Sequence, residues 1–248
     1  MLKVAAFTDI GLVRQNNEDS LYIGCPWGGL EENLFVVADG MGGHKGGEYA
    51  SRFVARRIPE LLHARGKKGN IDRALEEATE KANAALYRIS CESEELKGLG
   101  STLVMAYWDK SRFHIINVGD SRAYLFRDGL LMQVTEDHSL VEEMVRSGRL
   151  ERDDEMYRAN RHVITRAMGT EPYVDEDLFR VEAPPGSRLL LCTDGLHGML
   201  EGDLITGILT EEKDTEAAAE RLVAEAKKGG GKDNITVILI DVLEEENT

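Results

Sequence analysis

The segment Leu34–Gly43, LFVVADGMGG, constrains this chain more than any other. A short apolar run rich in β-forming residues leads directly into Asp39, and a glycine-rich turn follows. This pattern predicts a buried strand that ends at a carboxylate. Burying a carboxylate is costly unless a cation balances its charge. The segment therefore predicts a strand whose tip belongs to a cation-dependent site.

The same arrangement of an apolar run and an aspartate occurs elsewhere in the chain. It recurs at Ile115–Asp120 (IINVGD) and Leu189–Gly195 (LLLCTDG), and Asp233 precedes the apolar run Ile235–Val242. A single Asp-Gly pair is usually a turn, but aspartates at the junctions of several strands and turns predict one shared acidic site. Oxygen ligands without matching histidines or cysteines favour Mg²⁺ or Mn²⁺ over Zn²⁺. The pattern predicts a metal-dependent hydrolase that holds two ions about 4 Å apart.

A polar segment near the start of the chain carries a further candidate site. Arg14 lies four residues before Glu18, and Asp19 follows directly. An isolated arginine is commonly a surface charge. Beside carboxylates at the mouth of an acidic metal site, however, a guanidinium suits the oxygens of a phosphate group.

Composition excludes several classes of protein. The 248 residues are 42% hydrophobic and carry a net charge of −15, without a basic stripe that would suit a nucleic acid. The acidity is either a solvated surface or a gathering of carboxylates for metal. No segment has the roughly 20 apolar residues of a membrane span, and no secretion signal is expected. Three cysteines without a CxxC pair favour a reducing cytoplasm.

Hydrophobic periodicity predicts a single α+β domain with helices outside antiparallel sheets. Strands linked by short turns, rather than by helices, argue against a doubly wound parallel sheet. The expected strands are 2–7, 21–23, 34–40, 98–108, 112–118, 121–126, 130–134, 178–182, 188–192 and 235–242. The expected helices are 48–63 with a kink at Pro59, 71–89, 136–148, 203–209 and 216–228, and 149–161 is expected to be an exposed excursion.

Eight segments in order carry a family resemblance: RQNNED, VVADGMGGHKGGEYAS, GSTLV, VGDSRAYL, TEDHSLV, ITRAMG, LLLCTDGL and KDNITVILI. They resemble the metal-dependent protein phosphatase family (PPM, the phosphatase 2C type), and in particular bacterial serine/threonine phosphatases that consist of the catalytic domain alone. The resemblance runs from about residue 3 to residue 242. It implies a four-layer α/β/β/α sandwich with the metal centre at one end of the cleft between the sheets, and a variable flap at about 137–170.

The resemblance also implies a role for each motif residue. Asp39 would bridge two ions, Mn²⁺ or Mg²⁺, and the Gly40 carbonyl would ligate one of them. Asp194 and Asp233 would hold the other ion, and Asp120 would ligate a third, weaker one. Residues expected to act around these ions are Glu18 and Asp19, through metal-bound waters, and Arg14, through the substrate phosphate.

Two positions depart from the family pattern. Met41 stands where many relatives have a histidine that protonates the leaving oxygen, and His44 is the nearest histidine. The general acid is therefore either His44 or a water molecule, with His44 then an ordinary loop residue. Gly198 stands where many relatives have an acidic residue near the third metal.

The resulting hypothesis is a protein serine/threonine phosphatase that acts as a monomer in the cytoplasm. Activated water would attack phosphoserine or phosphothreonine in line, without a phosphoenzyme, and would reverse a cognate serine/threonine kinase. Two alternatives remain open: a catalytically silent binding module of the same fold, and a two-metal hydrolase of small phosphorylated metabolites.

Overall fold

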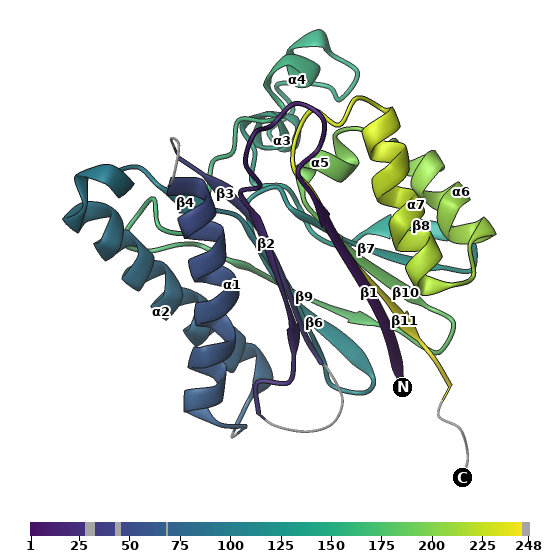
Figure 1. Cartoon of the computed structure of the whole chain (residues 1–248), viewed down its shortest axis with the longest axis horizontal. Coiled ribbons are helices and arrows are strands. Elements are labelled where there is room, and N and C mark those ends of the chain that lie inside the picture. The colour runs from purple at the N-terminus through teal and green to yellow at the C-terminus, as the bar shows by residue number, and fades with distance from the viewer. Residues whose placement is uncertain (28–32, 43–45, 68, 245–248) are drawn as a thin grey trace.

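The computed structural model describes residues 1–27, 33–42, 46–67 and 69–244, which form two antiparallel sheets with helices on their outer faces (Figure 1). The first sheet has the order β1 (Leu2–Asp9), β11 (Ile235–Val242), β10 (Arg188–Cys192), β7 (Arg122–Arg127) and β8 (Leu130–Gln133). The second has the order β2 (Asp19–Gly24), β3 (Leu34–Met41), β5 (Leu103–Trp108), β6 (Arg112–Val118) and β9 (Asp177–Glu182), and β4 (Gly100–Ser101) pairs with β3.

Each sheet has its own layer of helices. The second sheet is covered by α1 (Gly46–Arg65) and α2 (Ile71–Glu92), and a short 3₁₀ turn, η1 (Glu94–Leu96), follows them. The first sheet is covered by α5 (Asp194–His197), α6 (Gly202–Glu211) and α7 (Thr215–Lys228). Two short helices, α3 (Leu140–Arg146) and α4 (Glu155–Asn160), lie together at one end of the sandwich (Figure 1). The predicted four-layer arrangement is confirmed.

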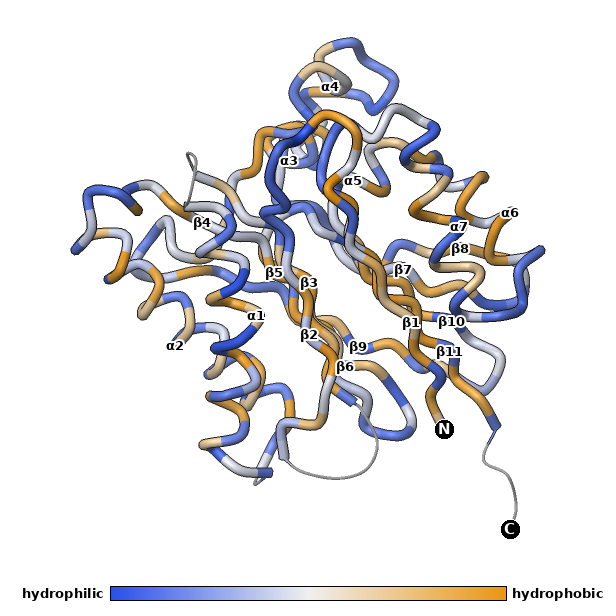
Figure 2. Tube along the Cα trace, viewed as in Figure 1, coloured by the Kyte–Doolittle hydropathy of each residue, from blue (hydrophilic) through white to orange (hydrophobic). Residues whose placement is uncertain are grey.

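The core consists of three apolar layers, one between the sheets and one under each set of helices. Figure 2 shows the apolar residues concentrated along the strands and the polar residues on the outer faces of the helices. All eight residues of β11 are buried, because this strand has neighbours on both edges and packing on both faces. Among the described residues no helix is long and apolar enough to cross a bilayer.

Several predicted elements have different bounds in the structure. The helix predicted from residue 136 begins at Leu140, because the Ser139 hydroxyl caps it by accepting from the Glu142 amide at 3.3 Å. The excursion predicted for 149–161 contains α4, which is capped by Asp154. Helix α1 continues as one element through Pro59, and the kink at this residue stays a prediction.

Candidate metal centre

Asp39 lies inside β3, two residues before the strand ends at Met41, and Asp19 lies directly opposite it on β2. The backbone at Asp39 is held by Thr102, whose hydroxyl accepts from the Asp39 amide at 2.9 Å and whose amide donates to the Asp39 carbonyl at 2.8 Å. The Thr102 hydroxyl is in turn 2.7 Å from that of Ser121, just after Asp120. Extended backbone thus brings three of the predicted site residues to one end of the sandwich.

The electrostatics of this end show that carboxylates converge there. Loss of hydration, followed by the charges of the neighbouring aspartates, raises the pKa of Asp39 well above its usual range. The same two causes raise the pKa of Asp120 to about 8 and contribute to raising that of Asp194 to about 6. The pKa of Asp19 rises to about 7, mainly through burial. These acids resist ionisation because they are buried together without enough positive charge nearby. Bound cations would supply that charge.

Unpartnered oxygens at the cluster agree with a cation site. Among the described residues, no hydrogen-bond donor reaches Oδ1 of Asp19 or Oδ1 of Asp194, although both atoms are buried. Buried carboxylate oxygens normally have partners, so these two atoms fit metal or metal-bound water. No three acidic, histidine or cysteine side chains within the described ranges form a complete ligand group by themselves. Mg²⁺ usually keeps several water ligands, so one or two carboxylates together with water suit it.

The Gly40 carbonyl lies where the backbone of β3 comes close to the start of α1. The Gly40 amide donates to the Glu18 carbonyl at 3.0 Å. A Cβ on Gly47, at the start of α1, would lie 2.8 Å from the Gly40 carbonyl oxygen and 2.8 Å from the Glu18 carboxyl carbon. Glycine is thus required at Gly47 for α1 to begin against the end of β3. The predicted ligand Gly40 and the predicted water-binding Glu18 lie beside the same helix terminus.

Asn234 joins the remaining segments, and sequence reasoning missed it. Its side-chain oxygen accepts from the Glu18 amide at 2.8 Å, and its side-chain amide donates to the carbonyls of Ile10 at 3.0 Å and Asn16 at 2.9 Å. A Cβ on Gly195 would collide with the Asn234 carbonyl, so α5 also packs tightly on this loop. The polar residue between Asp233 and the apolar strand was the available signal.

Thr193 is a second positioning residue that the sequence did not reveal. Its hydroxyl donates to Oδ2 of Asp19 at 2.9 Å and accepts from the Thr236 amide at 3.1 Å. Asp194 follows as the first residue of α5. Because α5 begins two residues after β10 ends, Asp194 lies close to the end of that strand.

Arg14 reaches the candidate site from the loop that follows β1. Its Nη2 atom donates to Oδ2 of Asp233 at 2.7 Å, and its side chain is 50% exposed. The hydrogen bond to Asp233 raises the pKa of the guanidinium further. Gly11, at φ +80°, turns this loop against residue 231, where the Leu12 amide donates to the Gly231 carbonyl at 2.7 Å. The arginine is therefore held at the solvent side of the acidic cluster.

A cavity of about 340 Å³ adjoins the cluster. Asp120, Asp194 and Asp233 line it on one side, and the segment after α4 lines it on the other. The Arg161 guanidinium, within the predicted flap, donates to the Gly198 carbonyl at 2.8 Å. Gly198 itself adds no carboxylate, but the acidic side chains that line the same cavity are those of Asp120, Asp137, Asp194, Glu201 and Asp233.

The His197 side chain forms a hydrogen bond with the backbone of Asp120. Burial lowers its pKa well below the usual range, so the ring is neutral and its Nε2–H donates to the Asp120 carbonyl at 3.0 Å. The predicted candidate His44 falls outside the described residues. The structure thus places Arg14, Glu18, Asp19, Asp39, Gly40, Asp120, Asp194 and Asp233 at one end of the sandwich.

Comparisons with known proteins agree with this site. Residues 13–232 match the family described as Protein phosphatase 2C. The chain is 36% identical over 246 residues to the serine/threonine phosphatase stp of Listeria monocytogenes, covering 94% of this chain and 93% of that protein. The crystal structure of the Mycobacterium tuberculosis serine/threonine phosphatase PstP/Ppp superimposes with a TM-score of 0.87 at 36% identity, covering 98% of this chain and 99% of that one. The catalytic domain of PstP in complex with two manganese ions superimposes with a TM-score of 0.85 at 36% identity, with the same coverage. The chain belongs to the protein phosphatase 2C family.

Proposed function

We propose that this chain, a metal-dependent protein serine/threonine phosphatase, holds two Mn²⁺ or Mg²⁺ ions through Asp39, Gly40, Asp194 and Asp233. The observation that carries the assignment is the convergence of carboxylates whose pKa values are raised by burial and by one another. Asp39 bridges the two ions, and the Gly40 carbonyl completes one ligand set. Glu18 and Asp19 hold water in place beside them. When bound, the ions supply positive charge for the phosphoryl oxygens and a water acidic enough to attack near neutral pH.

Arg14 binds the substrate phosphate in this proposal. Its guanidinium is half exposed, next to Asp233, and its planar donors match two phosphate oxygens. Fixing the phosphate beside the acidic cluster aligns it for in-line attack, and the charge-assisted hydrogen bonds strengthen as charge moves in the transition state. A water molecule protonates the leaving oxygen, with His44 as the alternative donor.

Direct attack by water fits the chemistry of the nearby thiol. Cys192 is buried in β10, and burial raises its pKa to about 12. A thiol held in its protonated form is a poor nucleophile. The reaction therefore proceeds without a phosphoenzyme at this residue.

The wider assignment is also a proposal. Residues 1–248 act as one catalytic domain, with about 137–170 as the variable flap beside the active site, and Asp120 ligates a third, weaker ion. The substrates are phosphoproteins, and a cognate serine/threonine kinase forms the phosphate esters. We further propose a monomer in the cytoplasm, where three cysteines without a CxxC pair suit reducing conditions.

The test is hydrolysis of a phosphothreonine peptide by metal-stripped protein, with Mn²⁺, Mg²⁺, Ca²⁺ or nothing added back. Activity restored by Mn²⁺ or Mg²⁺ and lost in Asp233→Asn supports the proposal. Arg14→Ala should lower kcat/KM by about 100-fold, which corresponds to about 2.7 kcal/mol of lost transition-state binding. Full activity of Asp233→Asn would reject the ligand assignment. Faster hydrolysis of nucleotides than of the peptide would favour the metabolite alternative.

A further inference from the structure

A second cavity, of about 430 Å³, lies between α1 and α2. Its lining residues come from the two helices alone: Tyr49, Arg52, Phe53, Arg56, Arg57, Glu60, Ala85, Arg88 and Ile89. We call this feature the α1–α2 groove. None of these residues belongs to the candidate metal centre, so the groove requires an explanation of its own.

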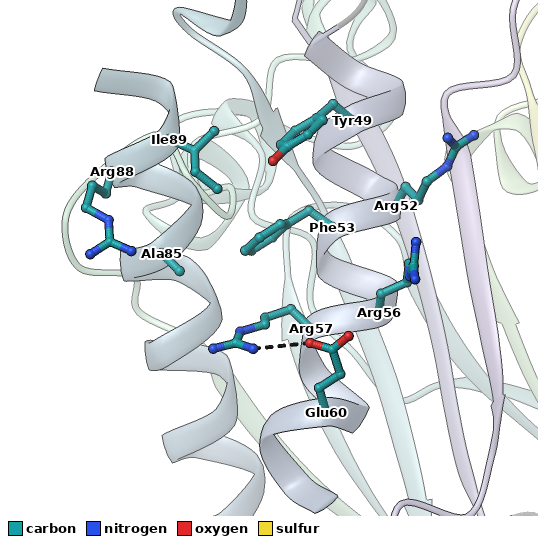
Figure 3. Close-up of a pocket in the computed structure, with 9 residues that line it drawn as sticks. All are labelled: Tyr49, Arg52, Phe53, Arg56, Arg57, Glu60, Ala85, Arg88 and Ile89. Carbon is teal, nitrogen blue, oxygen red and sulfur yellow. Dashed lines mark hydrogen bonds and ion pairs between the residues drawn. The ribbon is translucent and has the colours of Figure 1, made fainter. Parts of the chain in front are cut away.

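The floor of the α1–α2 groove is apolar. Figure 3 shows Tyr49 and Phe53 extending from α1 toward α2, where Ala85 and Ile89 face them. The rings of Tyr49 and Phe53 are stacked, with centroids 6.2 Å apart and planes 20° apart, and Tyr49 is 40% exposed. Aromatic side chains of this kind, with one face still exposed, are preferred anchors in protein interfaces.

Arginines surround this floor. Arg57 extends toward α2, whereas Arg52 and Arg56 extend to the other side of α1 and Arg88 points away from α1 (Figure 3). Arg57 pairs with Glu60 at 3.1 Å. Arg56 and Arg88 are exposed, and no carboxylate of the described ranges forms an ion pair with either of them.

The charge of the groove is opposite to that of the chain. Four arginines and one glutamate line it, in a protein with a net charge of −15. Arg52 pairs with Glu48 and Arg57 with Glu60. Among the described residues, Arg56 and Arg88 therefore carry the positive charge of the groove that no ion pair neutralises. The negative net charge disfavours an anionic partner in general, so a basic groove is the kind of surface on which such a partner would bind. Arginine also favours carboxylates over neutral partners, because its donors match both carboxylate oxygens. The observations thus favour an acidic segment that carries at least one large apolar side chain.

The position of the groove relates it to catalysis. Gly47 touches the Gly40 carbonyl and the Glu18 carboxyl, and Tyr49 is only two residues further along α1. From Gly47 to Glu60 the helix rises by roughly 20 Å, the length of about six extended residues. A polypeptide that leaves the metal centre along α1 therefore meets the groove directly.

We propose that the α1–α2 groove docks an acidic segment of the phosphoprotein substrate, outside the phosphorylated residue itself. The proposal rests on the proposed function for its substrate class. The arginines hold the acidic side chains, and the floor of Tyr49 and Phe53 holds an apolar one. Docking raises the local concentration of the phosphorylated residue at the metal centre without changing the chemical step.

Binding is measured first, on metal-stripped protein, so that the result does not depend on catalysis. The probe is a fluorescent 12-residue peptide of aspartate and glutamate with one central phenylalanine and no phosphate. Arg56→Glu/Arg88→Glu should raise its Kd at least about tenfold, since the charge pairs with the acidic peptide become repulsive. Arg127→Glu/Lys228→Glu changes the net charge equally at exposed sites elsewhere and should leave Kd unchanged.

The apolar floor has its own test. Tyr49→Ser should raise the Kd of the phenylalanine peptide, but not that of a peptide with serine at the centre. Equal weakening by both charge-reversal pairs would show attraction by net charge alone and would overturn the proposal. No measurable binding of the probe to the unaltered protein would overturn it as well.

Kinetics then separate docking from the active site. With a phosphothreonine peptide that carries the acidic segment, Arg56→Glu/Arg88→Glu should raise KM about tenfold and leave kcat unchanged. With para-nitrophenyl phosphate, both constants should stay unchanged. Loss of activity on both substrates in the variant would place these arginines in the catalytic machinery and would contradict docking. Failure of the unaltered enzyme on every phosphate ester would contradict the proposed function instead.

Discussion

Asp19 and Asp39 are direct partners across the antiparallel pair β2–β3, so two carboxylates share one face of the sheet at the same level. Like charges directly opposite one another destabilise a sheet. Here the Asp19 charge contributes to raising the pKa of Asp39. The two carboxyl groups can lie side by side when a cation balances their charge or when protons remove it. The carboxylates that suit a metal ion therefore destabilise the protein when no metal is bound.

Replacing Asp39 should therefore separate stability from activity. Asp39→Asn removes the proposed bridging ligand and should lower kcat at least about 100-fold. It also removes a charge from a desolvated acidic cluster, so metal-free protein should become about 1–3 kcal/mol more stable. Urea unfolding in chelator and peptide hydrolysis in Mn²⁺ measure the two effects.

The exposed Asp153→Asn is the matched control and should change neither quantity. A metal-free Asp39→Asn protein that is less stable than the unaltered one would show that the carboxylate is structurally satisfied without a cation.

The pH dependence of stability should have an unusual sign around neutrality. Asp120 and Asp19 have folded-state pKa values of about 8 and about 7, above the ordinary value of 3.8. The folded protein therefore binds their protons more tightly than the unfolded chain does. Their contribution to stability is complete below the unfolded pKa and is lost as pH rises through 7 and 8.

Metal-stripped protein should accordingly lose stability between pH 6.5 and pH 8.5, and Asp120→Asn, which mimics the protonated acid, should lose less. Thermal unfolding in chelator across this range tests the prediction. Saturating Mn²⁺ should reduce the slope, because cations replace the protons. A variant with the same slope as the unaltered protein would assign the effect to other groups.

The sequence predicted the strands and the acidic cluster because both depend on local patterns. An apolar run followed by aspartate is visible without any tertiary information, and Asp39, Asp120 and Asp194 were found in this way. Strand bounds were also close, since Ile235–Val242 and Arg188–Cys192 consist mainly of apolar and β-branched residues.

The missed features depend on contacts between distant segments. Asn234 joins residues more than 210 positions away, and Thr193 joins β2 to β11, so neither role can be seen in a local window. The start of α3 was missed because the capping Ser139 lies inside a polar segment with no clear period. The α1–α2 groove was missed because its two helices appeared only as separate amphipathic segments.

The close approach at Gly47 predicts a defect in metal binding without global unfolding. Gly47→Ala places a methyl group 2.8 Å from both the Gly40 carbonyl oxygen and the Glu18 carboxyl carbon, so the start of α1 must shift. We expect the Kd for Mn²⁺ to rise at least tenfold, on the order of 1.4 kcal/mol. Isothermal titration of stripped protein measures this quantity.

Gly207→Ala is the matched control, because Gly207 lies within α6 and a Cβ there meets nothing within 4 Å. It should leave the Mn²⁺ affinity unchanged and stabilise the protein by about 0.5–1 kcal/mol through the higher helix propensity of alanine. An unchanged Mn²⁺ affinity in Gly47→Ala would mean that Gly40 and Glu18 are not coupled to the ions.

A buried ion pair lies where β10 begins and β11 ends, away from the candidate metal centre, and it should affect stability independently of metal. Arg188 and Asp241 are register partners, joined by hydrogen bonds of 2.7 and 3.2 Å, and both are buried. Arg188 also donates to the carbonyls of Leu209 and Glu212 at the end of α6, and Thr215 donates to Asp241. The pair therefore connects the sheet to two helices.

Asp241→Leu leaves the Arg188 charge buried without its carboxylate and should cost about 3–5 kcal/mol of unfolding free energy. The double variant Arg188→Met/Asp241→Leu removes both charges and should lose much less than the two single changes together, because no uncompensated charge remains. Urea unfolding of the unaltered protein, Arg188→Met, Asp241→Leu and the double variant completes the cycle, in chelator and again in Mn²⁺. Since the pair contacts none of the proposed ligands, the coupling energy should be the same in both conditions. A coupling energy that changes with Mn²⁺ would show that this end of the sheet responds to the metal centre.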